Sequence, residues 1–186
     1  MRIISGKHRG RRIEAPKGME VRPTTDRCRE ALFNLLMHGH FEESPIIGQS
    51  VLDLCCGTGA LGLEALSRGA AHATFVDNSK RSLDCTRDNV AALGETGNAR
   101  FILSDVQHLP SSDKPVSSVL MDAPYHSGLI APAYQALVKR GWLRNSAVLA
   151  FEHSTKDPFP ELTGCEHITQ RDYGKTNVTI VQFSGG

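Results

Sequence analysis

From residue 50 onward, short apolar runs alternate with stretches of helical periodicity, and this alternation constrains the fold more than any other feature of the chain. Strands are predicted at 50–55, 73–77, 100–103, 116–121 and 147–151. Helices are predicted between them, at 60–68, 79–93 and 130–139. A chain that repeats strand and helix in this way favours an α/β fold with a parallel sheet and helices on both faces.

The end of the chain departs from this alternation. Two runs typical of strands occupy 167–171 and 178–183, and only residues 172–177 separate them. Because a linker this short cannot hold a crossover helix, the two strands should pair antiparallel. The predicted sheet is therefore parallel in its body and antiparallel at its close.

The start of the chain differs in charge from the rest. Residues 1–30 hold nine Lys or Arg and four acidic residues, whereas the other 156 residues hold 12 basic and 16 acidic ones. Apolar runs at 2–4 and 11–14 flank a glycine-containing turn, which predicts a β-hairpin with a basic tip, and a helix with one apolar stripe is expected next. We expect a single domain, with this extension at 1–48 and the body at 49–186.

The basic tip of the predicted hairpin indicates a polyanionic partner. Cations spaced this closely repel one another unless phosphates neutralise them, and this favours nucleic acid. The alternative is a solvated surface segment. The candidate nucleic-acid-binding residues of the tip are Lys7, His8, Arg9, Arg11 and Arg12.

Length and cysteine content argue against several other classes. The 186 residues suit one globular domain, and no apolar run is long enough for a membrane-spanning helix. The N-terminus carries charges where a signal peptide would carry its apolar run. The five cysteines include no C-x-x-C pair, so neither a disulfide framework nor a metal site is indicated. We expect a cytoplasmic protein without a membrane partner, and nothing in the sequence demands more than a monomer.

A glycine-rich loop, Gly57-Thr58-Gly59-Ala60-Leu61-Gly62, connects the first predicted strand of the body to the helix that follows. It matches the G-x-G-x-x-G fingerprint, with Asp77 fifteen residues after its last glycine. Taken literally, the pattern indicates NAD, although a tight strand-to-helix turn without a ligand fits it as well. The same loop geometry serves any adenosine-bearing cofactor of this size.

The residue before the loop distinguishes between these cofactors. Asp53 ends the first strand, where a dinucleotide would place its pyrophosphate, and a carboxylate there would repel the diphosphate. It would attract an ammonium or sulfonium group, and S-adenosylmethionine carries both and has no phosphate. We therefore expect Asp53 near the methionine ammonium, Gly57 and Gly59 under the cofactor, and Asp77 on the ribose. Asp105 could accept a hydrogen bond from the adenine amine, or be an ordinary loop residue.

The turn Asp122-Ala123-Pro124-Tyr125 follows the strand at 116–121, at the edge where open α/β sheets bind ligands. An exocyclic purine amine is a poor nucleophile until acceptors hold its N–H groups, because its lone pair is delocalised into the ring. Asp122 and the carbonyl of Ala123 can supply two such acceptors, and Tyr125 offers a surface on which the base can stack. The alternative is a proline turn that merely ends the strand.

Four segments together carry a resemblance to a known family. They are R-I-I-S-G-K-H-R-G-R-R-I at 2–13, R-P-T-T-D-R-C-R-E-A-L-F-N-L-L at 22–36, D-L-C-C-G-T-G-A-L-G-L-E-A-L-S-R-G-A at 53–70 and D-A-P-Y at 122–125. The chain resembles the bacterial methyltransferases that modify the N2 amine of guanine-966 in 16S ribosomal RNA, the small-subunit rRNA methyltransferase D type. The loop and the turn alone indicate only amino-methylation, and the two N-terminal segments make the resemblance specific.

The resemblance implies a Rossmann-like, seven-stranded class I methyltransferase sheet, S-adenosylmethionine as cofactor, and 16S rRNA as partner, in the small ribosomal subunit or its assembly intermediate. The catalytic residues that it implies are Asp122, Ala123, Pro124 and Tyr125. The implied cofactor-binding residues are Asp53, Cys55, Gly57, Thr58, Gly59, Asp77, Asn78, Asp105 and Val106. The implied RNA-binding residues are Lys7, His8, Arg9, Arg11, Arg12, Arg22, Thr24 and Thr25.

The sequence also departs from the family pattern. Ala123 stands where the family has proline, which restores a backbone N–H and some freedom of the backbone but keeps the acceptor carbonyl, so we expect activity to persist. Cys55-Cys56 replaces the more usual aromatic-small pair. Three other functions stay open at this point: methylation of an adenine N6 amine, an NAD-dependent oxidoreductase, and a non-catalytic RNA-binding module.

Overall fold

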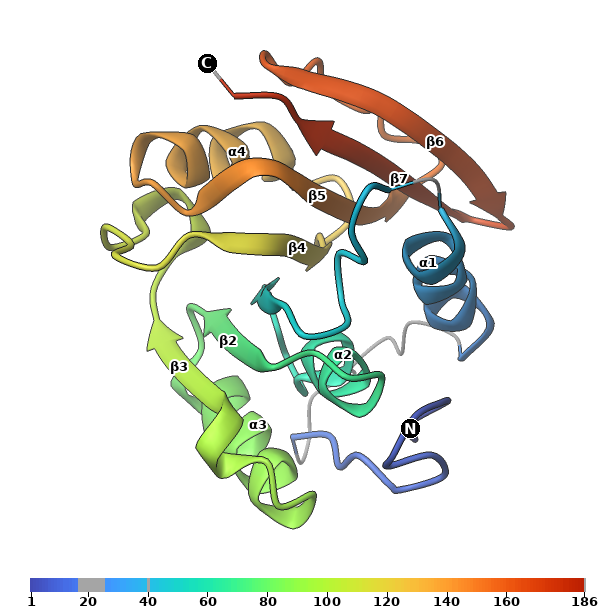
Figure 1. Ribbon diagram of the computed structural model, residues 1–186, viewed down its shortest axis with the longest axis vertical. Helices are drawn as coiled ribbons and strands as arrows, with labels where there is room; N and C mark the ends of the chain where they lie inside the picture. The colour runs from blue at the N-terminus through green and yellow to red at the C-terminus, as the bar shows by residue number, and fades with distance from the viewer. Residues whose placement is uncertain (17–25, 40, 186) are drawn as a thin grey trace.

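The apolar runs of the sequence form one twisted sheet with helices on both sides (Figure 1). The computed structural model describes residues 1–16, 26–39 and 41–185. Within them the sheet has seven strands in the order β3-β2-β1-β4-β5-β7-β6. The strands are β1 Ser50–Leu54, β2 His72–Asp77, β3 Ala99–Leu103, β4 Val116–Asp122, β5 Leu143–Ser154, β6 Cys165–Tyr173 and β7 Thr176–Phe183.

Strand direction confirms the predicted architecture. The strands β3, β2, β1, β4 and β5 are parallel, whereas β7 pairs antiparallel with both β5 and β6. The short connection between β6 and β7 is a turn at Gly174 and Lys175, as expected for a linker that cannot hold a helix. The fold is therefore α/β, with a seven-stranded sheet that is parallel in its body and closes antiparallel.

The helices divide between the two faces of the sheet. They are α1 Asp26–His38, α2 Ala60–Ser67, α3 Lys80–Ala92 and α4 Ile130–Lys139, together with the short 3₁₀ helices η1 Thr96–Asn98 and η2 Val106–His108. Side chains of α1, α2 and α3 share one core cluster with Val148 and Ala150 of β5. Side chains of α4 share a second cluster with Leu149 and Phe151. Alternate residues of one strand thus face different helices, as the pleat of a strand requires.

Residues 1–16 fold back on themselves and lie against α2 and α3 (Figure 1). The predicted β-hairpin is reduced to a single antiparallel bridge between Arg2 and Arg12, because tight turns occupy the residues between its arms. Ile3 and Ile13 are buried and belong to the core cluster on the α1–α3 side of the sheet. The segment is therefore packed onto the body, and we call residues 1–16 the basic arm.

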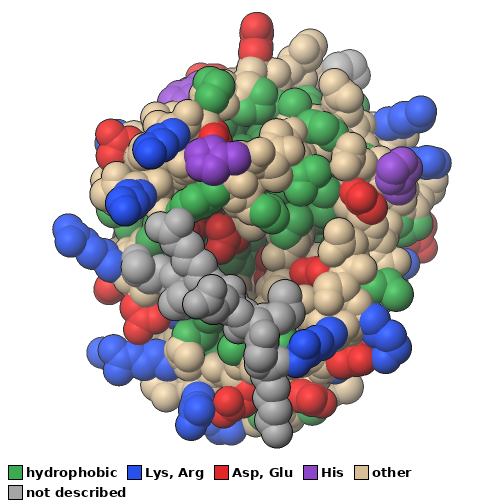
Figure 2. Space-filling view, turned by 180° about the vertical axis from the view of Figure 1, so that it is seen from behind, with side chains coloured by type: hydrophobic (Ala, Val, Ile, Leu, Met, Phe, Trp, Pro, Cys, Tyr) green, Lys and Arg blue, Asp and Glu red, His purple; other side chains and the backbone are tan. Residues whose placement is uncertain are grey.

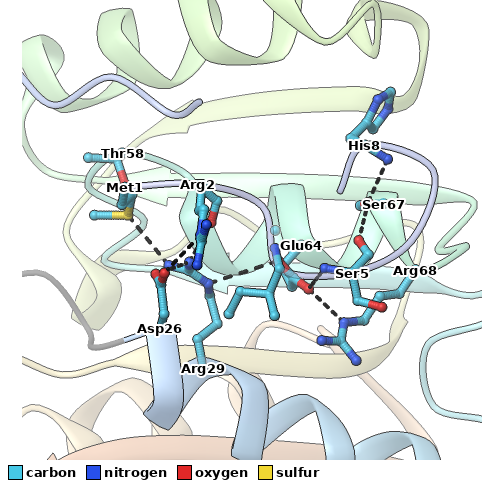
Figure 3. A network of polar contacts seen from close by, with 12 residues as sticks. Met1, Arg2, Ser5, His8, Asp26, Arg29, Thr58, Glu64, Ser67 and Arg68 are labelled. Atoms are coloured by element: carbon cyan, nitrogen blue, oxygen red, sulfur yellow. Dashed lines mark hydrogen bonds and ion pairs between the residues drawn. The ribbon is translucent and has the colours of Figure 1, made fainter. Parts of the chain in front are cut away.

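Glu64 of α2 joins the basic arm to two helices (Figure 3). Its carboxylate accepts hydrogen bonds from the backbone N–H groups of Ile4 at 2.8 Å and Ser5 at 3.0 Å. The guanidinium of Arg68 donates to the same carboxylate at 2.7 Å, and that of Arg29 in α1 lies 3.9 Å from it. A buried carboxylate needs partners of this kind, since leaving it unpaired costs several kcal/mol. None of the helices that the structure describes is long and apolar enough to cross a membrane.

Candidate active site

Four acidic side chains lie at the carboxyl ends of neighbouring strands. Asp53 of β1 is in register with Phe75 of β2, and Asp122 of β4 is in register with Glu152 of β5. Because side chains alternate along a strand, Asp53, Asp77, Asp122 and Glu152 all project from the face that α1, α2 and α3 cover. Carboxylates gathered in this way favour a cationic or donor-rich ligand.

A cavity of about 290 Å³ opens beside this row of acids. Eight of the predicted site residues line it, namely Cys55, Gly57, Asp77, Asn78, Asp105, Val106, Asp122 and Pro124. It is also lined by Pro16, Ser79, Ser82 and Leu129, which the sequence analysis did not select. Its volume falls near the lower end of the range for small-molecule sites. The structure thus brings six of the predicted cofactor residues to one cavity with Asp122 and Pro124 of the acceptor turn, whereas Ala123 and Tyr125 of that turn do not line it.

The missed residues had signals of unequal strength. Ser79 is the N-cap of α3, where its hydroxyl accepts from the backbone N–H of Ser82 at 3.2 Å. A serine two residues after the strand-end acid, at the start of a predicted helix, is a signal for such a position. Pro16 reaches the cavity from the basic arm, which no local pattern could have indicated.

Asp77 ties the glycine loop to α3. One of its carboxylate oxygens accepts from the N–H of Gly57 at 2.9 Å, and the other accepts from the N–H of Ser79 at 2.8 Å. Gly57 has a φ of 55°, a left-handed conformation that favours glycine. The last glycine of the fingerprint serves packing instead, because a Cβ on Gly62 would lie 2.3 Å from the ring of Phe75.

Asp53 lies beneath the loop and is not on the wall of the cavity. It is 1% exposed, and its carboxylate accepts from the backbone N–H of Gly62 at 2.8 Å. Burial raises the pKa of Asp53 to about 8, the Gly62 hydrogen bond opposes this shift, and the charges of Asp122 and Asp77 add to it. Its predicted contact with a methionine ammonium stays a prediction. Thr58 and Gly59 do not line the cavity either.

Cys55 and Asp105 occupy special backbone positions on the cavity wall. Cys55 has a φ of 55°, and burial raises the pKa of its thiol to about 12, so the thiol stays protonated and is a poor nucleophile. Asp105 is the N-cap of η2, where its carboxylate accepts from the N–H of Gln107 at 2.8 Å. Asp105 is therefore a loop cap that also lines the cavity, and its hydrogen bond with an adenine amine stays a prediction.

The turn after β4 is held by its own backbone. The N–H of Ala123 donates to the carbonyl of Glu152 at 3.1 Å. A proline at this position, as in the family pattern, would lack this N–H. The carbonyl of Pro124 accepts from the Ser127 hydroxyl at 2.5 Å. Among the described residues, no donor reaches the carbonyl of Ala123. The turn therefore keeps as an acceptor the carbonyl that the sequence selected.

The segment that follows the turn is tied to the loop after β5. The backbone N–H of His126 donates to one oxygen of Asp157 at 2.8 Å, and its Nδ1 lies 2.6 Å from the other oxygen. These hydrogen bonds lower the pKa of Asp157, and the backbone bond is the largest contribution. His126 itself is left-handed, with a φ of 58°. His126 therefore fixes the residues that follow the acceptor turn to the loop after β5.

The predicted RNA-binding residues of the basic arm divide into two groups. Lys7 and His8 contact the carboxylate of Glu95, at 2.7 and 2.5 Å. Burial raises the pKa of Glu95, but hydrogen bonds from Lys7, Asn98 and His8 outweigh it and hold this pKa at about 2. The arginines Arg9, Arg11 and Arg12 do not contact Glu95 and are exposed, with Arg11 donating to the Ala92 carbonyl at 2.8 Å and Arg12 lying 2.9 Å from the Glu14 carboxylate. The remaining predicted residues, Arg22, Thr24 and Thr25, lie outside the described residues.

One side chain connects the basic arm to the glycine loop. The Nδ2 of Asn89 in α3 donates to the carbonyl of Thr58 and to that of Glu14, both at 3.0 Å. Its Oδ1 accepts from the backbone N–H of Glu14 at 2.9 Å. The arm therefore borders the cavity and is bonded to the loop that forms its floor.

The face opposite to that of Figure 1 is hollowed near its middle, and acidic and apolar side chains meet in the hollow (Figure 2). Lys and Arg side chains lie around the periphery of this face. Among the described residues, no group of three or more His, Cys, Asp or Glu side chains could hold a metal ion.

Comparison with known proteins places this geometry in a family context. The family described as "Conserved hypothetical protein 95" matches residues 1–182. Ribosomal RNA small subunit methyltransferase D of Escherichia coli is 37% identical over 161 residues, which cover 86% of this chain and 78% of that protein. The protein of the same name from Haemophilus influenzae is 32% identical over 163 residues, covering 85% and 81%. The solved structure of the yhhF protein of Escherichia coli superposes with a TM-score of 0.85 at 34% identity, covering 100% of this chain and 99% of that one.

Proposed function

The chain belongs to the family described as Conserved hypothetical protein 95, and from this premise we propose that it transfers a methyl group from S-adenosylmethionine to the N2 amine of guanine-966 in 16S rRNA. Its similarity to ribosomal RNA small subunit methyltransferase D supports the reaction class, an rRNA methyltransferase. The observation that carries the proposal is one cavity whose wall holds Asp77 and Asp105 on the cofactor side and Asp122 on the acceptor side.

The donor groups of the cavity fit S-adenosylmethionine. The N–H of Gly57 donates to one carboxylate oxygen of Asp77, and the N–H of Ser79 donates to the other. A carboxylate fixed in this way is suited to accept hydrogen bonds from ribose hydroxyls. Asp105 and Val106 stand on the same wall, where an adenine amine and ring would lie. The carboxylates around the cavity attract a sulfonium and an ammonium group and disfavour a diphosphate, which argues against NAD. When bound, S-adenosylmethionine supplies an electrophilic methyl group.

The residues of the acceptor turn would activate and orient the amine. Asp122 and the carbonyl of Ala123 accept its two N–H groups, which turns the nitrogen lone pair out of conjugation. Tyr125 provides a ring for stacking, worth about 1–3 kcal/mol per base. The amine loses one proton when it gains the methyl group, and the Asp122 carboxylate is the base that the turn offers. Catalysis by these residues consists of positioning and electrostatics.

We propose that the exposed arginines of the basic arm bind rRNA phosphates. Arg9, Arg11 and Arg12 are exposed on an arm that borders the cavity, so a strand held there lies near the acceptor turn. The partner is 16S rRNA, in the small subunit or in its assembly intermediate, and the place of action is the cytoplasm, where this RNA is found. Neutralising these arginines should weaken RNA binding and flatten its salt dependence, with cofactor binding unchanged.

Labelled methyl transfer to 16S rRNA from cells that lack the protein tests the proposal. We expect one N2-methylguanine, identified by mass spectrometry of the digested RNA, and its loss in Asp122→Ala. Asp113→Ala, which changes an exposed aspartate, is the matched control and should keep full activity. A methyl group on another nucleoside would contradict the substrate, and binding of NAD without binding of S-adenosylhomocysteine would contradict the cofactor.

A further inference from the structure

We infer that Lys156 and Lys175 bind the backbone phosphates next to the target nucleotide, on the side of the acceptor turn away from the basic arm. This inference rests on the proposed function and adds a second RNA-binding surface to it. Lys156 lies in the loop that follows β5, and Lys175 lies in the turn between β6 and β7. Neither lysine is among the residues that the sequence analysis selected for RNA.

Hydrogen bonds join the segments of both lysines to each other and to the acceptor turn. The backbone N–H of Thr155, the residue before Lys156, donates to the carbonyl of Lys175 at 3.1 Å. The residue after Lys175 is Thr176, and its hydroxyl is hydrogen-bonded to the phenol of Tyr125. The two lysines are therefore held beside the ring on which the target base would stack.

Both ammonium groups are accessible and lack a protein partner. Lys156 and Lys175 are exposed, and among the described residues neither ammonium takes part in an ion pair or a hydrogen bond. Asp157, the acid next to Lys156, is bonded to the backbone N–H and the ring of His126 instead. Cations on contacting segments repel each other, and a phosphate bound by both removes that repulsion. The pair therefore fits a polyanion.

The order of the sheet separates this surface from the basic arm. The strands β5 and β7 follow β4 in the sheet, whereas β1 and β2, which carry the glycine loop and Asp77, precede it. The basic arm packs on the helices of that other side, where Arg11 donates to the carbonyl of Ala92 at the end of α3. Lys and Arg side chains lie on both sides of the hollow in Figure 2. An RNA strand that reaches from the arm to the two lysines would therefore cross the cavity at the acceptor turn.

The test compares two double variants that remove equal charge. One combines Lys156→Ala with Lys175→Ala. The matched control combines Lys114→Ala with Lys139→Ala, which removes two exposed lysines near the amino ends of β4 and β5, at the opposite edge of the sheet. Binding of a 16S rRNA fragment is titrated at several salt concentrations.

The salt dependence of binding counts the phosphates that are lost. Each phosphate contact with a single strand contributes about 0.7 to the slope of log affinity against log salt concentration. We expect the variant that lacks Lys156 and Lys175 to lose about 1.4 of this slope, and its affinity to fall about 10-fold or more at about 0.1 M salt. The control should bind as the wild type does.

Methylation kinetics show that the two lysines act on binding. Since they do not touch the reacting atoms, we expect KM for RNA to rise while kcat stays within about 2-fold of the wild type. Affinity for S-adenosylhomocysteine should not change, which also shows that the variant is folded. RNA fragments shortened on one side of the target test the position: shortening on the lysine side should abolish the difference from the control, and shortening on the other side should keep it.

Several outcomes would overturn this inference while the proposed function stands. The first is that the variant lacking Lys156 and Lys175 binds and methylates 16S rRNA as the control does. The second is a loss confined to the assembled subunit, with normal binding of free RNA, which would assign the two lysines to a ribosomal protein. The third is a difference from the control that survives shortening of the RNA on either side. If the wild type itself does not methylate 16S rRNA, the proposed function has failed and the inference falls with it.

Discussion

The phenol oxygen of Tyr125 lies 2.5 Å from the hydroxyl oxygen of Thr176, which links the acceptor turn to the first residue of β7. The antiparallel strand pair at the end of the chain therefore positions the ring that would stack on the substrate base. Tyr125 could thus contribute in two ways, through stacking of its ring and through the hydrogen bond of its hydroxyl, and variants can test the two separately.

Tyr125→Phe keeps the ring and removes the hydrogen bond to Thr176. We expect RNA affinity to change little and kcat to fall modestly, by a factor of about 2–10, since one neutral hydrogen bond contributes about 0.5–1.5 kcal/mol. Tyr125→Ala should lose a further 1–3 kcal/mol, roughly, through lost stacking. Single-turnover methylation and RNA binding measure both effects. Thr176→Val should behave as Tyr125→Phe, and a loss as large as that of Tyr125→Ala would refute this division.

The raised pKa of Asp53 predicts how its contribution to stability depends on pH. The folded state keeps the proton up to about pH 8, whereas the unfolded chain releases it near pH 3.8, so folding binds a proton between these values. The free energy of unfolding of the wild type, relative to Asp53→Asn, should therefore fall as pH rises from 4 to 8, by at most about 1.4 kcal/mol per pH unit. Urea unfolding of both proteins at pH 5 to 9 measures this, and parallel curves would contradict it.

Gly6 tests whether the basic arm acts through its charge or through its docking. A Cβ on Gly6 would lie 1.9 Å from the backbone oxygen of Ser67, so Gly6→Ala should displace the arm from α2 without changing any charge. Gly10 has a similar φ, 82° against 81°, but a Cβ there has nothing within 4 Å, which makes Gly10→Ala the matched control.

Both variants impose a left-handed alanine, which costs about 1–2 kcal/mol. We expect Gly6→Ala to be the less stable of the two and to bind 16S rRNA more weakly, because its arginines are no longer held beside the cavity. Thermal unfolding and RNA titration measure the difference. Equal RNA affinity of the two variants would show that charge alone suffices.

Ala123→Pro tests how the chain compensates for its missing family proline. The substitution removes the hydrogen bond from Ala123 to the Glu152 carbonyl, a loss of about 0.5–1.5 kcal/mol. It also stiffens the unfolded chain, a gain of about 0.4–1 kcal/mol. We expect the stability of the variant to stay within about 1 kcal/mol of the wild type and methylation to persist. A large fall in kcat with unchanged stability would show that the Ala123 hydrogen bond positions the acceptor carbonyl.

The sequence predicted the sheet because periodicity and linker length are local properties. The strands and helices of the body are those expected, and α4 coincides with its predicted range of 130–139. The strand predicted at 147–151 extends to Leu143–Ser154, because Leu143 also pairs with Val116 of β4, beyond a register irregularity that no apolar pattern marks. The β-hairpin predicted at the start of the chain forms only one bridge, because turns that contain glycine occupy most of the residues between its arms.

The site was predictable only where a motif marks it. The glycine loop and the turn at Asp122 are contiguous in sequence, so their residue types disclose them. The positions of Glu152, Asp157 and Pro16 depend on register and on packing between distant segments, which no local pattern encodes. Sequence reasoning also could not tell that Lys7 and His8, read as RNA contacts, would be paired with Glu95.

Asn89 bonds to Glu14 in the basic arm and to Thr58 in the glycine loop. Whatever steadies one of these segments therefore steadies the other, and the two ligands should assist each other: bound RNA should tighten S-adenosylhomocysteine by the same factor by which S-adenosylhomocysteine tightens RNA. Calorimetry with either ligand already present measures that factor. Asn89→Ala should bring this coupling factor close to one. The cooperativity between the two ligands would therefore depend on a single side-chain amide.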